Sequence, residues 1–340
     1  MPHLKNADYM YETRYHKDSL GQYTFLVTGG AGFIGSNLVE YLLRYGARRV
    51  RVLDDLSGGK RETIDLFASQ PAFEFIEGDI CDPDTCRRAC EGVDFVAHQA
   101  ALGSVPRSVK DPLRTNQVNV TGFLNVLQAA TVEPSVRKMV YAASSSTYGD
   151  SREMPKVEDR IGKPLSPYAV TKYVNELYAD VFSRLYGFHT CGLRYFNVFG
   201  PRQDPDGPYA AVIPLFIKAA LEGKPPLIHG DGAQTRDFTF VENVVQANVQ
   251  ALLGEGLPKQ HSVFNIACGQ SISLNDLWRE LAALAGTAAE PTYGPPREGD
   301  IRDSLADIGK ARAILGYEPH IDTKTGLRLA FEWYKAHGGV

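Results

Sequence analysis

The fold of this chain is decided by Tyr23–Arg44, which reads YTFLVTGGAGFIGSNLVEYLLR. A short apolar run is followed by glycines at 29, 32 and 35 and then by a helical pattern. In such a GxxGxxG loop, Gly29 permits a tight turn, Gly32 lets a pyrophosphate approach the backbone, and Gly35 lets the helix pack on the strand. The start of the helix adds free N–H groups and a favourable dipole for phosphate. The stretch therefore predicts a dinucleotide-binding loop.

A carboxylate follows the loop at the distance that a dinucleotide site requires. The next expected strand ends in Asp54, close to the roughly 20 residues after the loop at which an acid accepts hydrogen bonds from the adenosine ribose. An acid at this place also repels a 2′-phosphate, which favours NAD over NADP. Lys60 and Arg61 lie nearby and leave that preference open. We expect NAD as the cofactor.

The pattern continues outward as an alternation of short β-branched or aromatic runs with amphipathic segments, from Gln22 to about Tyr195. This alternation predicts a doubly wound parallel sheet, the Rossmann α/β class, with helices on both faces. The expected strands are Thr24–Thr28, Val50–Leu53, Phe73–Glu77, Phe95–His98, Met139–Ala142 and His189–Tyr195. The expected helices include Asn37–Arg44, Asp82–Glu91, Val118–Ala130 and Tyr168–Leu185.

The pattern changes after Tyr195, where Gly200–Pro208 is rich in proline and glycine and predicts a long functional loop. We expect a smaller α+β lobe that binds substrate, formed by about 201–234 and 263–340. The NAD-binding domain then comprises 23–200 and about 235–262. Residues 1–22 form a polar N-terminal extension rich in tyrosine, whose role the sequence leaves open.

Composition excludes several classes of function. The chain has 36 Lys and Arg against 40 Asp and Glu, a net charge of −4, so we expect neither nucleic acid nor an anionic membrane as a partner. It contains no apolar run long enough to span a bilayer, and no apolar signal-peptide centre at its start, so we expect a cytoplasmic protein. The five cysteines fit reduced apolar residues, and no metal site is expected.

A candidate catalytic group follows the expected strand at Met139–Ala142. Ser144 begins a hydroxyl-rich run at the carboxyl end of that strand, where ligands of open α/β sheets bind. Tyr168 and Lys172 lie four residues apart and share one helix face. A tyrosine has a pKa near ~10, and both a lysine ammonium and a nicotinamide charge favour its phenolate. We expect Tyr168 to remove a sugar hydroxyl proton, with Ser144 bridging by hydrogen bond.

The glycine loop, the serine-rich strand end and the YxxxK motif together resemble the extended short-chain dehydrogenase/reductase family. RYFNVFGP at 194–201 and RDFTFV at 236–241 are similar to further motifs of that family. The resemblance covers roughly Thr24 to Trp333, and within the family it points most closely to the UDP-N-acetylglucosamine 4-epimerases.

The resemblance also implies site residues, which we name by their numbers in this chain. The implied cofactor contacts are Gly29, Gly32, Phe33, Ile34, Gly35, Asp54, Asp79, Ile80, Gln99, Ala100, Ala101, Asn119, Tyr168, Lys172, Tyr195 and Val198. The implied substrate contacts are Ser104, Ser144, Ser145, Ser146, Asn197, Ala211, Val212, Arg236, Arg297, Asp300 and Ser304. Guanidinium groups such as those of Arg236 and Arg297 suit a diphosphate.

The reaction implied is 4-epimerisation of a UDP-sugar through a transient 4-keto sugar, with NAD held tightly and regenerated. Ser304 stands where related epimerases restricted to plain hexoses carry a bulky tyrosine, so we expect room for an N-acetyl group and a preference for UDP-GlcNAc and UDP-GalNAc. The resemblance further implies a homodimer through helices that include the one bearing Tyr168, and a role in supplying cell-surface polysaccharide synthesis.

Several alternatives stay open at this point. UDP-glucose or a UDP-uronate are alternative substrates, the latter because Arg302 adds a basic residue. A nucleotide-sugar 4,6-dehydratase or decarboxylase usually carries an acid just before the Tyr-Gly of the strand-end motif, where this chain has Ser145, Ser146 and Thr147. A non-catalytic NAD-binding scaffold is disfavoured because Ser144, Tyr168 and Lys172 are all present.

Overall fold

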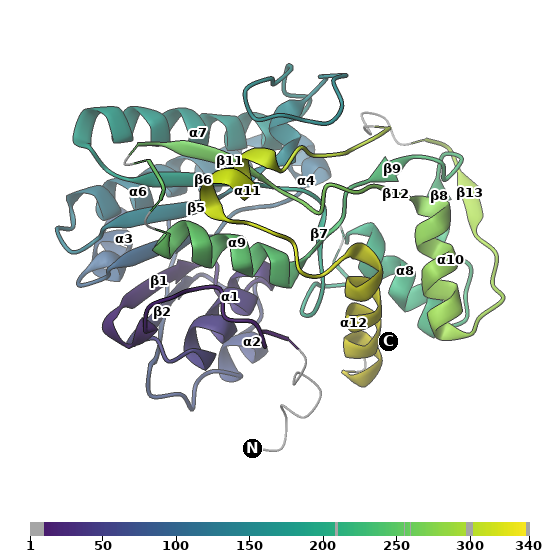
Figure 1. Cartoon of the computed structure of the whole chain (residues 1–340), viewed down its shortest axis with the longest axis horizontal. Helices are drawn as coiled ribbons and strands as arrows, with labels where there is room; N and C mark the ends of the chain where they lie inside the picture. The colour runs from purple at the N-terminus through teal and green to yellow at the C-terminus, as the bar shows by residue number, and fades with distance from the viewer. Residues whose placement is uncertain (1–9, 208–209, 255, 259, 297–301, 338–340) are drawn as a thin grey trace.

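The centre of the protein is a seven-stranded parallel sheet, as seen in a computed structural model that describes residues 10–207, 210–254, 256–258, 260–296 and 302–337. The strands follow the order β11-β6-β5-β4-β1-β2-β3 across the sheet (Figure 1). Their bounds are β1 Thr24–Thr28, β2 Arg49–Asp54, β3 Phe73–Glu77, β4 Phe95–His98, β5 Lys138–Ser144, β6 Thr190–Tyr195 and β11 Ser262–Ile266.

The sheet is covered on both faces, which is why its central strands are buried along their whole length. All five residues of β1 and all six of β6 are buried. Successive side chains of β1 point to opposite faces: Phe25 and Val27 belong to one apolar core and Leu26 to the other. The Rossmann-like class predicted from the sequence is confirmed. The chain reverses its direction of travel across the sheet between β1 and β4, the place where such sheets bind ligands.

Helices form the two outer layers (Figure 1). The core around Leu26 is closed by α3 (Pro83–Cys90), α6 (Phe123–Val132) and α7 (Pro167–Tyr186), and the core around Phe25 by α1 (Phe33–Arg44) and α9 (Val241–Leu253). Shorter helical segments complete this part of the chain. They are η1 Leu20–Gln22, α2 Arg61–Asp65, α4 Val105–Lys110, α5 Pro112–Asn116, the π-helix η2 Gln117–Gly122, η3 Ser145–Tyr148 and α11 Gly309–Leu315.

The six strands expected from the sequence are all present, with ends shifted by at most a few residues. Two features differ. β11 was not predicted, because its polar Ser262 and Asn265 interrupt the apolar pattern, and it carries the sheet past the boundary expected near residue 262. The expected helix Val118–Ala130 is a π-helical segment followed by α6, a change of winding that hydrophobic spacing does not reveal.

A smaller group of elements lies beside the sheet, at the right of Figure 1. Helices α8, α10 and α12 pack together there, and short strand pairs connect them to the sheet. Their bounds are β7 Val198–Phe199, α8 Val212–Leu221, β8 Leu227–His229, β9 Thr235–Arg236, β10 Thr239–Phe240, β12 Ile272–Ser273, α10 Leu274–Ala285, β13 Thr292–Gly294 and α12 Thr323–Ala336. Among the described residues, none of the helices is both long enough and apolar enough to cross a bilayer.

The end of the N-terminal extension packs against the outside of α1 and α9. Tyr11 is fully buried, and its hydroxyl donates to Asn37 Oδ1 of α1 at 2.6 Å. Its backbone N–H and the hydroxyl of Tyr15 both donate to Glu242 Oε1 of α9, each at 2.9 Å. The Tyr15 ring stacks on Tyr41. These contacts join the helix after the phosphate loop to α9.

We predict that Tyr11 contributes strongly to stability. Tyr11→Ala removes a buried ring and should lower the free energy of unfolding by about 3–5 kcal/mol. Tyr11→Phe leaves Asn37 Oδ1 without its donor and should cost about 1–3 kcal/mol. Urea unfolding measures both. Tyr293→Phe, at an exposed ring, is the control and should change stability by no more than about 0.5 kcal/mol. Unchanged unfolding of Tyr11→Ala would show that the extension does not stabilise the fold.

Candidate active site

The glycine loop between β1 and α1 has no room for a side chain at Gly29 or at Gly35. Gly29 has φ +71°, and a Cβ there would lie 2.6 Å from the backbone nitrogen of Ala100, at the end of β4. A Cβ on Gly35 would collide with the carbonyl oxygen of Gly29. The loop is therefore pressed against the end of β4 and against its own helix. This is the close packing that the sequence pattern predicted.

The loop and the start of α1 fit a dinucleotide pyrophosphate. Gly32 is the N-cap of α1, and no side chain caps the helix. The N-terminus of this twelve-residue helix, which begins at Phe33 and Ile34, lies at the carboxyl end of β1. Its first turn carries no acidic side chain that could take the place of a bound anion. A bound pyrophosphate would complete the cap.

Asp54 ends β2 beside the loop, where the sequence placed it. Its Oδ2 accepts the N–H of Ala31 at 2.9 Å and its Oδ1 accepts the N–H of Leu56 at 2.9 Å. Burial raises the pKa of this carboxyl, and the two backbone donors oppose that shift. Asp54 therefore orders the loop and the next turn while its carboxylate lies at the ribose end of the predicted site.

The remaining predicted cofactor residues line the same edge. Asp79 Oδ1 accepts the N–H of Cys81 at 2.8 Å, and Arg114 lies 3.4 Å from its Oδ2. Burial works against ionisation of Asp79, but these donors hold its pKa below the ordinary value. Ile80 is buried and packs against Gly122 of the π-helix. The partnership between Asp79 and Arg114 was not foreseen from the sequence.

Gln99 and Tyr195 meet in a closed ring of hydrogen bonds. The Tyr195 hydroxyl donates to Gln99 Oε1 at 3.1 Å and accepts from Asn248 Nδ2 at 2.8 Å, and Gln99 Nε2 donates to Asn248 Oδ1 at 3.0 Å. Asn248 is a fully buried residue of α9. From α9 it fixes two predicted cofactor residues, and no sequence motif marks it.

The three predicted catalytic residues come together at the end of β5. The side chains of Tyr168 and Ser144 interact, and this interaction acts to lower the pKa of Tyr168. Lys172 Nζ donates to the carbonyl oxygen of Ala142 at 2.7 Å and lies 6.0 Å from the centre of the Tyr168 ring. Ser166 caps α7 by accepting the N–H of Ala169, which fixes the start of the helix that carries both residues.

Burial controls the ionisation of this group. It raises the pKa of Tyr168, which the Ser144 hydrogen bond partly offsets, and it lowers the pKa of Lys172 to about 8. Lys172 is thus still mainly an ammonium at pH 7. A positive charge beside Tyr168, such as the nicotinamide charge named in the sequence analysis, would act against the effect of burial and favour the phenolate.

Asn119 connects the π-helix to the catalytic helix. Its Nδ2 donates to Thr171 Oγ1 at 3.2 Å, and its Oδ1 accepts the N–H of Leu102 at 2.8 Å. Thr171 directly precedes Lys172. π-Helical turns are common at functional sites, and this one places a buried amide next to the residue that precedes Lys172.

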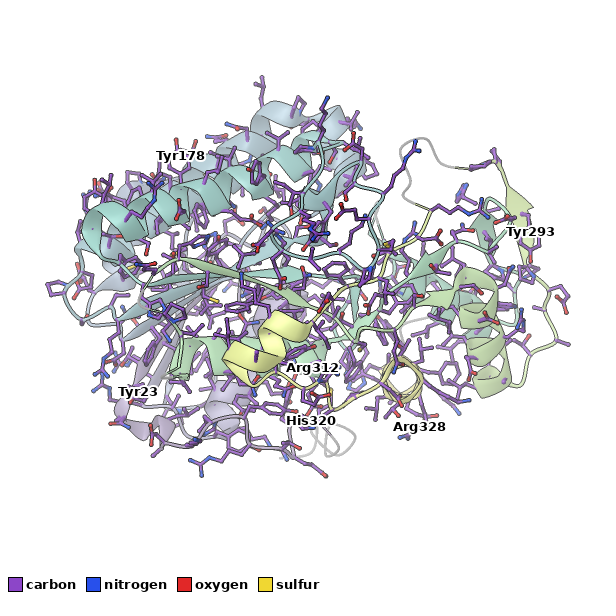
Figure 2. The ribbon with its side chains drawn as sticks, turned by 45° about the horizontal axis from the view of Figure 1, so that its top comes forward. Tyr23, Tyr178, Tyr293, Arg312, His320 and Arg328 are labelled. Carbon is purple, nitrogen blue, oxygen red and sulfur yellow. The ribbon has the colours of Figure 1, made fainter. Side chains whose placement is uncertain are left out.

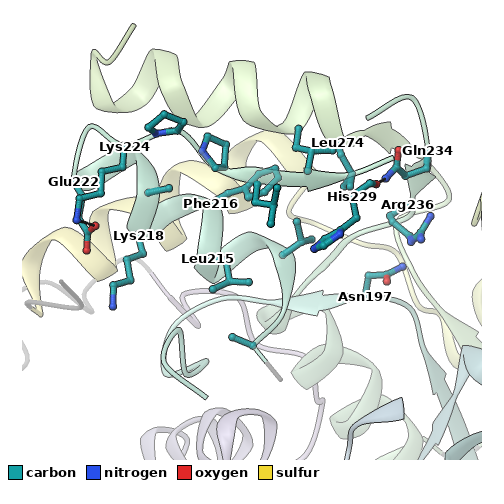
Figure 3. Close-up of a pocket in the computed structure, with 17 residues that line it drawn as sticks. Asn197, Leu215, Phe216, Lys218, Glu222, Lys224, His229, Gln234, Arg236 and Leu274 are labelled. Atoms are coloured by element: carbon teal, nitrogen blue, oxygen red, sulfur yellow. Dashed lines mark hydrogen bonds and ion pairs between the residues drawn. The ribbon is translucent and has the colours of Figure 1, made fainter. Parts of the chain in front are cut away.

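A cavity of about 500 Å³ opens between the sheet edge and the small lobe (Figure 3). Asn197 and Arg236 lie at one end of it, and Lys218, Glu222 and Lys224 lie at the other. Asn197 Nδ2 donates to the carbonyl oxygen of Asp237 at 3.0 Å, and Arg236 donates to the carbonyl oxygen of Thr235. Three predicted substrate residues line this cavity: Asn197, Val212 and Arg236.

The other predicted residues do not line this cavity, and two of them lie outside the described part of the chain. Ser104 caps α4, Ser145 and Ser146 form the turn after β5, Ala211 directly precedes α8 without capping it, and Val198 lies in β7. The N–H of Ser304 donates to the carbonyl oxygen of Thr235 at 3.2 Å, which places Ser304 next to Arg236. Arg297 and Asp300 lie outside the described residues.

Sequence reasoning missed several residues that line the cavity, among them Phe216, Lys218, His229 and Gln234. Phe216 and Lys218 come from α8, whose apolar pattern reads as an ordinary packing helix. His229 ends β8, a three-residue strand between Pro226 and Gly230. The one sequence signal was the group of proline and glycine residues around this segment. Such residues indicate a loop, but they do not show that the loop lines a cavity.

Comparison with known proteins identifies the family. Residues 25–267 match the model of the NAD dependent epimerase/dehydratase family. A UDP-glucose 4-epimerase of Mycolicibacterium smegmatis is 39% identical over 312 residues, covering 91% of this chain and 98% of the relative. The chain belongs to this family, and its cofactor is NAD.

Two solved structures share the fold over nearly their whole length. One is a UDP-N-acetylglucosamine 4-epimerase from Methanobrevibacter ruminantium in complex with UDP-N-acetylmuramic acid, with a TM-score of 0.86 and 38% identity over 93% of this chain and 99% of that chain. The other is a UDP-glucose 4-epimerase from Thermotoga maritima with UDP-glucose, also with a TM-score of 0.86 and 38% identity, over 92% of this chain and 99% of that chain.

We predict that Asp54 is required for tight NAD binding. Asp54→Ala removes the ribose acceptor and frees the N–H groups of Ala31 and Leu56, so NAD affinity should fall about 10- to 100-fold. The amount of NAD that stays with the protein after extended dialysis measures this. Asp55→Asn is the matched control, because Asp55 lies next in the chain and accepts from Ser57 at the surface. Equal NAD retention by Asp54→Ala and wild type would contradict the assignment.

Proposed function

We propose that this protein is an NAD-dependent 4-epimerase of UDP-sugars, with a preference for UDP-GlcNAc and UDP-GalNAc. The observation that carries the proposal is the contact of Tyr168 with Ser144, with Lys172 beside them, at the same sheet edge as the NAD loop. The similar proteins from Mycolicibacterium smegmatis, Methanobrevibacter ruminantium and Thermotoga maritima are all named as UDP-sugar 4-epimerases.

The geometry supports the following roles. The glycine loop and Asp54 would hold NAD, which would supply the hydride acceptor for sugar C4 and the hydride donor for the other face of a transient 4-keto sugar. Tyr168 takes the proton of the C4 hydroxyl and gives it back, and Ser144 holds that hydroxyl and the phenol in one hydrogen-bonded line. The Lys172 ammonium favours the phenolate while the proton is away. Each group serves both half-reactions.

We propose that the nucleotide sugar is held by the small lobe, the group of elements around α8, α10 and α12. The cavity has the size expected of a small-molecule site, and Asn197 and Arg236 place an amide and a guanidinium at the end nearer the sheet. A guanidinium suits the diphosphate, and apolar side chains such as Phe216 and Leu274 suit a nucleobase. Firm anchoring of the nucleotide leaves the sugar free to turn between half-reactions.

The N-acetyl preference rests on the small side chain of Ser304. Its backbone hydrogen bond to Thr235 places it next to Arg236, and a tyrosine at this place would occupy volume that an N-acetyl group needs. UDP-N-acetylmuramic acid, bound by the Methanobrevibacter ruminantium enzyme, is itself an N-acetylated sugar nucleotide. The product would supply cell-surface polysaccharide synthesis.

A dehydratase or decarboxylase is disfavoured by the turn after β5. The 3-10 helix Ser145–Tyr148 presents hydroxyl groups, and Ser146 Oγ donates to Ser144 Oγ at 2.9 Å. Loss of water or of a carboxylate needs a further acid/base group at this turn. Ser145, Ser146 and Thr147 offer no carboxylate.

The direct test incubates the purified protein, without added NAD, with UDP-GlcNAc and separately with UDP-glucose. Proton NMR then follows the products. Equilibration of UDP-GlcNAc with UDP-GalNAc, faster than that of UDP-glucose with UDP-galactose, is the expected result. Faster turnover of UDP-glucose would contradict the preference but not the epimerisation. A 4-keto product, or no 4-epimer from either substrate, would contradict the proposed function.

We predict that Ser304→Tyr reverses the substrate preference. The added ring should lower kcat/KM for UDP-GlcNAc by about 10-fold or more, because it fills the space for the N-acetyl group, and leave UDP-glucose turnover within about 3-fold of wild type. Ser304→Ala is the control, since it keeps the volume and should keep the preference. An equal loss on both substrates would show that residue 304 does not distinguish them.

We also propose that the protein is a homodimer formed through α7. Apolar side chains form an exposed stripe along this helix, at positions that share one face: Val170, Leu177, Val181 and Leu185. Tyr178 lies beside the stripe, on the side of α7 away from the sheet (Figure 2). Val109 and Leu113, on α4 and α5 next to α7, are 65% and 83% exposed and extend the same apolar surface. A second copy related by a two-fold axis would cover this self-complementary patch.

We expect the wild type to run as a dimer in size-exclusion chromatography with light scattering. Leu177→Asp places a charge in the middle of the apolar stripe and should give a monomer with an unchanged circular dichroism spectrum. Leu66→Asp is the control, because Leu66 is 56% exposed on another surface and should leave the dimer intact. A monomeric wild type, or a dimeric Leu177→Asp, would contradict the proposed interface.

A further inference from the structure

A buried ion pair lies directly behind the catalytic group. Arg194 of β6 and Glu176 of α7 form two parallel hydrogen bonds, Nε to Oε1 at 2.8 Å and an Nη to Oε2 at 2.7 Å. Their side chains are only 4% and 6% exposed. The geometry is a bidentate fork, which fixes the direction as well as the distance between strand and helix. Neither residue has a role in the reaction described above.

The ion pair connects the two elements that carry the catalytic residues. Glu176 follows Lys172 by one helical turn and Tyr168 by two, so the three side chains share one face of α7. Arg194 pairs in register with Ala143 of β5, and its neighbour Tyr195 pairs with Ser144. The fork therefore ties the helix of Tyr168 to the strand that lies beside Ser144.

Arg194 also contacts the chain segments between these elements. A second Nη donates to the carbonyl oxygen of Glu158 at 2.9 Å, in the segment that leads into α7. The guanidinium lies 4.9 Å from the centre of the Tyr148 ring, in the turn that follows Ser144. The Tyr148 hydroxyl in turn donates to Asn265 Oδ1 of β11 at 2.6 Å. A single guanidinium thus contacts α7, the segment that leads into it, and the turn that follows Ser144.

Stability alone is a poor reason for this arrangement. Taking two charges out of water costs free energy that their attraction often does no more than offset, and apolar residues of similar volume can replace such pairs without loss of stability. Geometry is a better reason, because a displacement of about 1 Å in a reacting group can cost about 100-fold in rate.

We propose that Arg194 and Glu176 are positioning residues that set the Ser144–Tyr168 separation for catalysis. The inference rests on the proposed roles of Ser144, Tyr168 and Lys172. Beyond those roles, it assigns the precise placement of Tyr168 against Ser144 to a buried ion pair. Arg194, one member of that pair, is the first residue of the RYFNVFGP motif.

The test compares Glu176→Gln and the double variant Arg194→Met/Glu176→Leu with wild type, on whichever UDP-sugar the wild type turns over. Both variants should keep bound NAD and a KM within about 3-fold of wild type, while kcat falls about 10- to 100-fold. The double variant should unfold within a few degrees of wild type, which separates loss of positioning from loss of stability. Asp180→Asn is the control, because it breaks the exposed Asp180–Arg184 pair on the same helix and should leave kcat unchanged.

A second measurement does not depend on turnover. Titration of Tyr168 by NMR of isotope-labelled tyrosine should show a changed pKa in Glu176→Gln, because the Ser144 hydrogen bond that lowers this pKa is no longer held in place. Wild-type kcat and an unshifted Tyr168 titration in Glu176→Gln would overturn the proposal, even if the double variant fails to fold. An inactive wild type would instead contradict the proposed function, and the Tyr168 titration would still test the positioning.

Discussion

Gly29 lies so close to Ala100 that a Cβ at this position would be 2.6 Å from the Ala100 backbone nitrogen, so that only glycine fits there. This close approach occurs where the chain changes direction across the sheet, between β1 and β4. It places the uncapped start of α1, the carboxylate of Asp54 and the end of β4 around one dinucleotide site. Because β5 is the next strand after β4, Ser144 comes to the same edge. The proposed catalytic residues are therefore located next to a packing constraint at a glycine.

Local sequence patterns were sufficient to predict the elements whose structure depends on residues close together in the chain. Strand β1, the glycine loop and α1 were predicted because their spacing is contained in one stretch, and Tyr168 and Lys172 because four residues make one helical turn. The sequence did not predict β11, the Arg114–Asp79 pair or Asn248. Those features depend on contacts between residues far apart in the chain. The spacing of apolar residues within one segment gives no information about such contacts.

Buried polar groups at this edge act as fixed supports for the residues that contact ligands. Asn248 holds Gln99 and Tyr195 from α9, and Asn119 holds the segment before Lys172 from the π-helix. The fork between Arg194 and Glu176 supports the same edge from β6. A site that reverses hydride transfer on both faces of a sugar needs a rigid frame around a loosely held substrate. The rigidity lies in the sheet and its buried polar network, and the space lies in the cavity beside the small lobe.

The most direct measurement is the kcat of Tyr168→Phe for 4-epimer formation, together with its content of bound NAD. The variant loses only the phenolic hydroxyl, so the fold, the phosphate loop and the nucleotide cavity are retained. NAD content equal to wild type with a fall in kcat of about 100-fold or more is the predicted result. A Tyr168→Phe enzyme that keeps its NAD and stays within about 3-fold of wild-type kcat would show that the proton is moved by another group.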